Sequence, residues 1–85
     1  MTEERYAYIG FGERVRARRK ELGWSQETLA EKAGLDRTYI GRCENGKQNA
    51  TLKTIYSLAE VIGVEATELL PPISEIGRRQ SEAVN

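Results

Sequence analysis

Apolar residues recur along this sequence at the three- and four-residue spacing of an α-helix, and glycines separate the segments in which they do so. The clearest stripe comprises Leu52, Ile55, Leu58, Ala59 and Ile62. Because glycine is favoured just past the end of a helix, each segment is expected to form a separate helix. No segment alternates with period two, so no β-sheet is expected. The predicted helices cover approximately residues 11–22, 25–33, 36–44, 51–62 and 66–70.

Side chains that can cap a helix stand at the start of three of these segments. Ser25, Asp36 and Thr51 each carry an oxygen that can accept a hydrogen bond from a backbone N–H of the first turn. The fifth segment begins after Glu65, which is a weaker capping residue. Two prolines at 71–72 end this segment. The pattern therefore predicts an all-α protein, a compact five-helix bundle.

The 85 residues are enough for one domain, with a core at about residues 10–70 and a C-terminal tail at 71–85. Within the tail, Ser74 could cap a last helical turn with Ile73 and Ile76 on one side. The rest is polar, and its composition favours a frayed tail unless another subunit holds it.

The composition excludes several kinds of chemistry. The sequence has no histidine and Cys43 is its only cysteine, which excludes Cys/His zinc sites, histidine-based catalysis and an intrachain disulfide. No nucleophile–base set can be named, so we expect neither an enzyme nor a metal or cofactor. No apolar run approaches the roughly 18 residues of a membrane span, and the N-terminus lacks the apolar stretch of a signal peptide. A cytoplasmic protein without membrane contact is expected.

The net charge is zero, but the charges are unevenly distributed along the chain. Residues 14–53 include ten basic and five acidic side chains, whereas residues 54–77 include four acidic side chains and no basic one. This asymmetry suits a protein with one side turned towards DNA, although chance on a solvated surface would also explain it.

Residues 26–45 carry the spacing of a helix-turn-helix. Counted from Gln26, small Ala30 falls at position five, Gly34 at nine, and apolar Ile40 and Cys43 at fifteen and eighteen. A small residue lets the two helices approach, glycine supplies the positive φ of the turn, and the apolar pair holds the second helix to the core. Several constrained positions agree, so the signal for this motif is strong.

The segments LGWSQETLA (22–30), GLDRTYI (34–40) and ENGK (44–47) resemble the Xre/Cro-type family of phage and bacterial repressors. The resemblance covers about residues 11–70. It implies a fold of the lambda-repressor-like DNA-binding type, with the helix-turn-helix at the second and third helices and double-stranded DNA as the partner. Within the family, the small size and the sequence RTYI at 37–40 are most similar to controller proteins of restriction–modification systems.

The third helix of such a protein enters the major groove of DNA. With Ile40 and Cys43 turned inward, Thr38 and Arg42 lie on the opposite side, and Arg37 can swing outward from the first turn. An arginine can offer two donors to guanine O6 and N7, and Thr38 can hydrogen-bond a base or pack its methyl group on thymine. We therefore predict base contacts by Arg37, Thr38 and Arg42. Solvated charge or phosphate contact alone is the competing interpretation for the arginines.

Contacts to the DNA backbone are predicted around this helix. The resemblance implies that Gln26 holds a phosphate, and the polar loop after the third helix can grip the backbone. The hydroxyl of Tyr39 could reach a phosphate, although a half-buried packing ring is equally consistent. The predicted backbone contacts are Gln26, Tyr39, Asn45, Lys47, Gln48 and Asn49.

Four further residues are interpreted as structural. Arg19 and Glu44 match a family pair that ties the first helix to the end of the third. Trp24 is expected to pack where the first two helices meet, and Cys43 is expected to be a buried thiol. The glycines of Gly10-Phe11-Gly12 follow no strand, so no phosphate-binding role is assigned to them.

A homodimer is predicted from the apolar residues that follow the four-helix core. In related proteins the fifth helix pairs with its two-fold mate, which here implicates Leu69, Leu70, Ile73 and Ile76; the competing interpretation is that they cap their own core. We expect an autoregulatory transcriptional regulator on a near-palindromic operator, without a small-molecule effector. The alternative is a partner-binding module, such as the antitoxin of a toxin–antitoxin pair.

Overall fold

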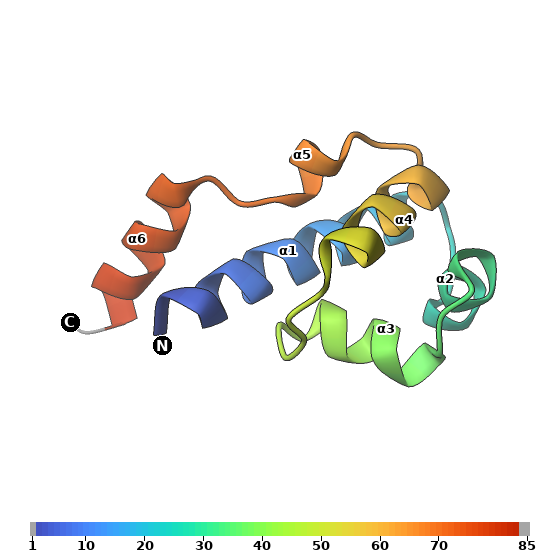
Figure 1. Cartoon of the computed structure of the whole chain (residues 1–85), viewed down its shortest axis with the longest axis horizontal. Coiled ribbons are helices and arrows are strands. Elements are labelled where there is room, and N and C mark those ends of the chain that lie inside the picture. Colours follow the sequence, from blue (N-terminus) through green and yellow to red (C-terminus); the bar gives the residue numbers. More distant parts are fainter. Residues whose placement is uncertain (1, 84–85) are drawn as a thin grey trace.

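The computed structural model describes residues 2–83, which form helices and turns without a β-strand. Figure 1 shows α1 running along the molecule, with α2 and α3 towards one end and α6 beside the N-terminal half of α1 at the other. The all-α class is confirmed, but residues 2–83 contain six helices where five were predicted. The helices are α1 (Thr2–Glu21), α2 (Gln26–Ala33), α3 (Arg37–Glu44), α4 (Leu52–Ile62), α5 (Ala66–Leu69) and α6 (Ile73–Ala83).

The core lies between the first five helices, and each of them contributes to it. Within the apolar stripe of α4, Leu58, Ala59 and Ile62 are buried and Ile55 is half-buried. Leu52 is 68% exposed, because it is the first residue of α4 and lies beyond the edge of the core. The fully buried side chains are Val15, Leu29, Ile40, Cys43, Leu58, Ile62 and Leu69.

Of the three residues predicted to cap a helix N-terminus, two do so through their side chains and one does not. The hydroxyl of Ser25 accepts the backbone N–H of Thr28 at 3.0 Å, and that of Thr51 accepts the N–H of Thr54 at 3.2 Å. Asp36 stands at the N-cap of α3 but makes no capping hydrogen bond through its side chain. At the start of α5 the Glu68 carboxylate accepts the backbone N–H of Glu65 at 2.8 Å, which strengthens this weakly capped end.

Helix α1 begins at Thr2, nine residues before the predicted start near Phe11. It continues through Gly10 and Gly12, and other parts of the chain approach it closely at both positions. A Cβ atom built on Gly12 would lie 2.1 Å from the carbonyl oxygen of Cys43, and one built on Gly10 would lie 2.7 Å from Pro71. The two glycines therefore make room for α3 and for the segment before α6.

The C-terminal tail is the second difference from the prediction. Residues 73–83 form α6 instead of a frayed tail, and side chains of α1 hold it in place. The Arg14 guanidinium donates to both carboxylate oxygens of Glu75, at 3.1 and 2.8 Å, and Arg79 pairs with Glu13. These partners are more than 60 residues apart in sequence, so local composition could not reveal them. No helix in the described part of the chain is long and apolar enough to cross a membrane.

Candidate nucleic-acid interface

A tight turn joins α2 to α3 and sets their relative orientation. Gly34 ends α2 with φ of 67°, a left-handed conformation that glycine adopts without strain. The backbone N–H of Leu35 donates to the carbonyl oxygen of Ala30 at 2.9 Å, and α3 begins two residues later. The helix–turn–helix arrangement predicted for residues 26–45 is present.

Helix α3 has one face in the core and one face open to solvent. Ile40 and Cys43 have no exposed surface, whereas Arg37, Thr38 and Arg42 are all exposed. The structure thus brings the three predicted base-contacting side chains to the outside of one short helix. Their contact with bases stays a prediction.

The guanidinium of Arg42 is held by the loop that follows α3. Its Nε donates to the Oε1 atom of Gln48 at 3.1 Å, and its Nη2 donates to the carbonyl oxygen of Lys47 at 3.2 Å. The backbone N–H of Lys47 in turn donates to the carbonyl oxygen of Arg42 at 2.9 Å. The end of α3 and the loop therefore form one hydrogen-bonded unit.

Residue Gln26 is the first residue of α2 and lies against the end of α3. Its amide nitrogen donates to the Oε1 atom of Glu44 at 3.1 Å, and the side chain is half-buried. One of its two N–H donors is engaged in this bond, which leaves the other for a phosphate. The phosphate contact of Gln26 stays a prediction.

The other predicted backbone contacts lie on or just after α3. Asn45, Lys47 and Asn49 are exposed and Gln48 is half-buried. Tyr39 is also half-buried and packs against the core, and burial raises the pKa of its hydroxyl. The packing interpretation of Tyr39 is therefore realised, and phosphate contact by these residues remains a prediction.

A buried ion pair fastens α1 to α3. The Arg19 guanidinium donates to Glu44 through Nε at 2.6 Å and through Nη2 at 2.8 Å, and only 7% of each residue is exposed. A third donor, Nη1, bonds the carbonyl oxygen of Trp24 at 2.8 Å. Burial alone would raise the pKa of Glu44, but the hydrogen bonds from Arg19 and Gln26 outweigh it and hold the pKa below 4.5. This is the pair that the family resemblance implied.

The two remaining structural interpretations also agree with the structure. Cys43 is a free, buried cysteine, and burial raises the pKa of its thiol to about 11. Trp24 packs against the core beside the junction of α1 and α2, and the Lys32 ammonium lies 5.0 Å from the centre of its ring.

The residues predicted to form a dimer interface are in different environments. Leu69 is 2% exposed and belongs to the core of its own chain, so its assignment to the interface is wrong. Leu70 and Ile73 are 41% and 87% exposed, which leaves them free for a partner. Ile76 is half-buried and lines a groove of about 310 Å³ next to Phe11.

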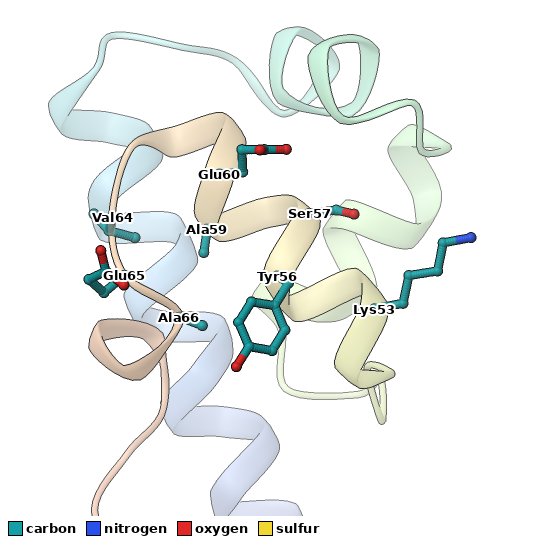
Figure 2. Close-up of a pocket in the computed structure, with 8 residues that line it drawn as sticks. All are labelled: Lys53, Tyr56, Ser57, Ala59, Glu60, Val64, Glu65 and Ala66. Carbon is teal, nitrogen blue, oxygen red and sulfur yellow. The ribbon is translucent and has the colours of Figure 1, made fainter.

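The exposed surface of α4 was not predicted as a site. Tyr56 is 62% exposed, although it is a large aromatic side chain, and it lines a hollow of about 410 Å³ between α4 and the start of α5 (Figure 2). Lys53, Ser57 and Glu60 share that surface of α4. The available signal was a tyrosine on the otherwise polar side of an amphipathic helix.

Known proteins share this sequence pattern. The family model described as "Helix-turn-helix" matches residues 15–69, well over half of the chain. The chain is 44% identical over 61 residues to a hypothetical transcription factor of Neisseria meningitidis, an overlap that covers 72% of this chain and 58% of that protein. It therefore spans less than two thirds of the length of this relative.

Solved structures share the fold. The restriction–modification controller protein C.AhdI from Aeromonas hydrophila matches with a TM-score of 0.71 and 45% identity, over 73% of this chain and 94% of that one. The biofilm regulator SinR, solved in complex with DNA, matches with a TM-score of 0.67 and 33% identity, over 69% of this chain and 95% of that one. Both similarities are strong enough to compare function as well as fold.

Proposed function

Because this chain belongs to the helix-turn-helix family of DNA-binding transcription regulators, we propose that it binds a near-palindromic DNA operator as a homodimer and controls transcription there. One observation carries the proposal: Arg37, Thr38 and Arg42 line the solvent face of α3, whose other face is fixed in the core. A helix so placed can enter the major groove without unfolding any part of the chain. Its place of action would be the cytoplasm, where the DNA is.

The more specific proposal is control of restriction–modification genes, including the gene of the regulator itself. It is supported by the 45% identity to C.AhdI over nearly all of that controller protein. The antitoxin alternative gains no support from α6, because α6 is bound to α1 of its own chain by ion pairs.

Selection of bound oligonucleotides from a random pool tests the proposal directly. The expected product is a two-fold motif with a fixed spacing between half-sites of about one helical turn, roughly 34 Å. Failure to enrich any motif, or equal binding to scrambled competitor, would overturn sequence-specific recognition.

Replacing Arg42 with alanine should weaken binding to the selected operator by about 1–3 kcal/mol and leave most non-specific binding intact, because a bidentate contact to guanine is lost. Fluorescence anisotropy with the operator and a scrambled duplex measures both affinities. Arg78→Ala is the matched control, because it removes the same charge from exposed α6. Equal losses on the two duplexes would make Arg42 a phosphate contact instead.

Replacing Lys47 with alanine should weaken binding to all sequences alike and reduce the slope of log K against log[salt] by about one, because one fewer counterion is released. Lys47 is exposed, and its two hydrogen bonds with Arg42 use only its backbone N–H and carbonyl groups, which the substitution preserves. Titrations at several salt concentrations measure the slope, and Lys47→Arg should keep it. An unchanged slope for Lys47→Ala would remove this residue from the interface.

Two surfaces that expose large apolar or aromatic side chains are available for the homodimer contact. One is formed by Leu70, which ends α5, and Ile73, the first residue of α6. The other is the α4 surface around Tyr56. Helix α6 lies at the end of the molecule away from α2 and α3, and α4 lies nearer to them (Figure 1), so a two-fold axis at α4 would bring the two α3 helices closer together than an axis at α6.

The α4 surface is the better candidate, and its charges are self-complementary. Lys53, Tyr56, Ser57 and Glu60 are spaced three and four residues apart, so they share one side of α4 (Figure 2). Two α4 helices packed antiparallel about Tyr56 would place the Lys53 ammonium of one subunit beside the Glu60 carboxylate of the other. An isologous contact of this kind satisfies both subunits at once.

Replacing Tyr56 with aspartate should therefore raise the dimer dissociation constant at least about tenfold, because it puts a charge into the apolar centre of the contact. Sedimentation equilibrium over a range of protein concentrations measures this constant. Ile73→Asp should leave it unchanged. The reverse pattern would assign the contact to the Leu70–Ile73 surface, and a wild-type monomer at every concentration, with and without operator, would refute the homodimer.

A further inference from the structure

One edge of the Arg42 guanidinium is occupied before any DNA is present. The Nε and Nη2 hydrogens lie on the same edge of the planar group, and they donate to the Gln48 side-chain oxygen and the Lys47 carbonyl oxygen, respectively. Within residues 4–83 no hydrogen bond or ion pair engages the other edge, formed by Nη1 and Nη2. That second edge offers two parallel donors.

Two parallel donors are what guanine recognition requires, because O6 and N7 accept side by side in the major groove. A long, exposed arginine side chain ordinarily samples many rotamers and loses that freedom when it binds. A guanidinium already fixed along one edge loses less conformational freedom when it binds a base. The bonds seen at Arg42 therefore favour binding at its second edge.

The loop that supplies these acceptors is itself fixed by the fold. Gly46 has φ of 70° and lies against α1, where a Cβ atom built on it would be 2.6 Å from the Ile9 side chain. The backbone N–H of Gly46 donates to the Cys43 carbonyl oxygen at 3.1 Å. Gln48 follows two residues later and is half-buried, beside Ala50 and Phe11 in the groove next to α1. Its side-chain oxygen therefore starts from an anchored backbone.

We propose that Gln48 is a positioning residue for base recognition: its side-chain oxygen, together with the Lys47 carbonyl, fixes the Arg42 guanidinium with the Nη1–Nη2 edge directed at a guanine. The inference rests on the proposed function, since it needs Arg42 to read a base. It assigns Gln48 a role beyond the phosphate contact predicted from the sequence, since Arg42 engages the amide oxygen, whereas a phosphate would be bound by the amide NH2 group. Gln48 then contributes to sequence preference and Lys47 to general affinity.

The contact can be tested in the free protein by NMR. The Arg42 Nε–H should exchange with solvent several-fold more slowly than that of Arg78, whose Nε–H has no hydrogen-bond partner within residues 4–83. Gln48→Ala should remove this protection, and Asn49→Ala, an exposed neighbour, should preserve it. Equal exchange at Arg42 and Arg78 in the wild-type protein would overturn the inference whatever the DNA experiments show.

The functional test uses the selected operator and a duplex in which the guanine of each half-site is replaced. Gln48→Ala should reduce the preference for the operator about three- to tenfold and leave binding to the replaced duplex nearly unchanged. Gln48→Glu keeps an acceptor for the guanidinium and should retain more of the preference. In an Arg42→Ala background, Gln48→Ala should have no further effect on the preference, because nothing remains to be positioned.

Two results would contradict the inference in separable ways. If Gln48→Ala weakens both duplexes equally, and does so again in the Arg42→Ala background, Gln48 is a phosphate contact and only the positioning role fails. If Arg42→Ala itself leaves the preference for the operator intact, the base-reading role of Arg42 in the proposed function fails, and the positioning role fails with it.

Discussion

Replacing Glu44 with alanine is expected to lower the free energy of unfolding by about 3–5 kcal/mol, because it leaves the buried Arg19 charge without its partner. The substitution also frees the Gln26 amide from its acceptor. Since domains of this size are stable by only about 5–15 kcal/mol, this one change removes a large share of the total. Urea unfolding followed by circular dichroism measures the difference.

A matched apolar replacement separates two contributions to the free energy of unfolding: the penalty for an unpaired buried charge and the stabilisation by the ion pair itself. The double variant Arg19→Met/Glu44→Leu should recover most of the stability lost in Glu44→Ala, since neither side chain then carries an unpaired charge. A loss below about 1 kcal/mol for Glu44→Ala would mean that the Arg19 charge reaches water without its partner.

The Glu44 pair also makes stability depend on pH. The pKa of Glu44 in the folded protein lies below its ordinary value of 4.5, so the stabilisation is fully present above that value and is lost as the pH falls through the folded-state pKa. Unfolding measured between pH 7 and pH 3 should therefore show a steeper decline for the wild-type protein than for Glu44→Gln, which has no carboxylate to protonate.

The second large effect is expected for Gly12→Ala. A Cβ atom at this position would lie 2.1 Å from the Cys43 carbonyl oxygen and 2.9 Å from that of Glu44, and both are backbone atoms that cannot rotate away. Helix α1 would have to move away from α3, at a cost at or above the upper end of the roughly 1–3 kcal/mol typical of overpacking. Urea unfolding measures the loss.

The control for Gly12→Ala is Gly77→Ala in α6, where nothing lies within 4 Å of the new methyl group. That substitution should be neutral or stabilise the protein by up to about 1 kcal/mol, because alanine has the higher helix propensity. If Gly12→Ala behaved like Gly77→Ala, the close approach of α1 to α3 would be wrong.

The features predictable from sequence depend on residues a few positions apart. Ser25 and Thr51 cap helices through bonds that reach three residues ahead, and Gly34 allows a turn that closes within five residues. The inward side of α3 follows from the spacing of Ile40 and Cys43. These positions predicted the helix–turn–helix and the exposed face of α3, because the motif is compact and its physical constraints are local.

The features that sequence reasoning missed depend on distant contacts. The early start of α1 and the whole of α6 were not predicted, because α6 is held against α1 by pairs such as Arg14–Glu75 that no local window contains. Leu69 was assigned to a partner because nothing in its neighbourhood shows that α1 and α4 enclose it. The Arg42–Gln48 bond spans a turn whose course depends on Gly46 packing against Ile9.

The enclosed thiol of Cys43 has a consequence for how such a regulator would respond to its surroundings. With a pKa of about 11 and no exposed surface, only about one thiol in ten thousand would be ionised at pH 7, even before access is considered. Peroxides and alkylating agents attack the ionised form, so they would find almost no target here. Oxidation or alkylation of Cys43 would therefore not control DNA binding by such a regulator.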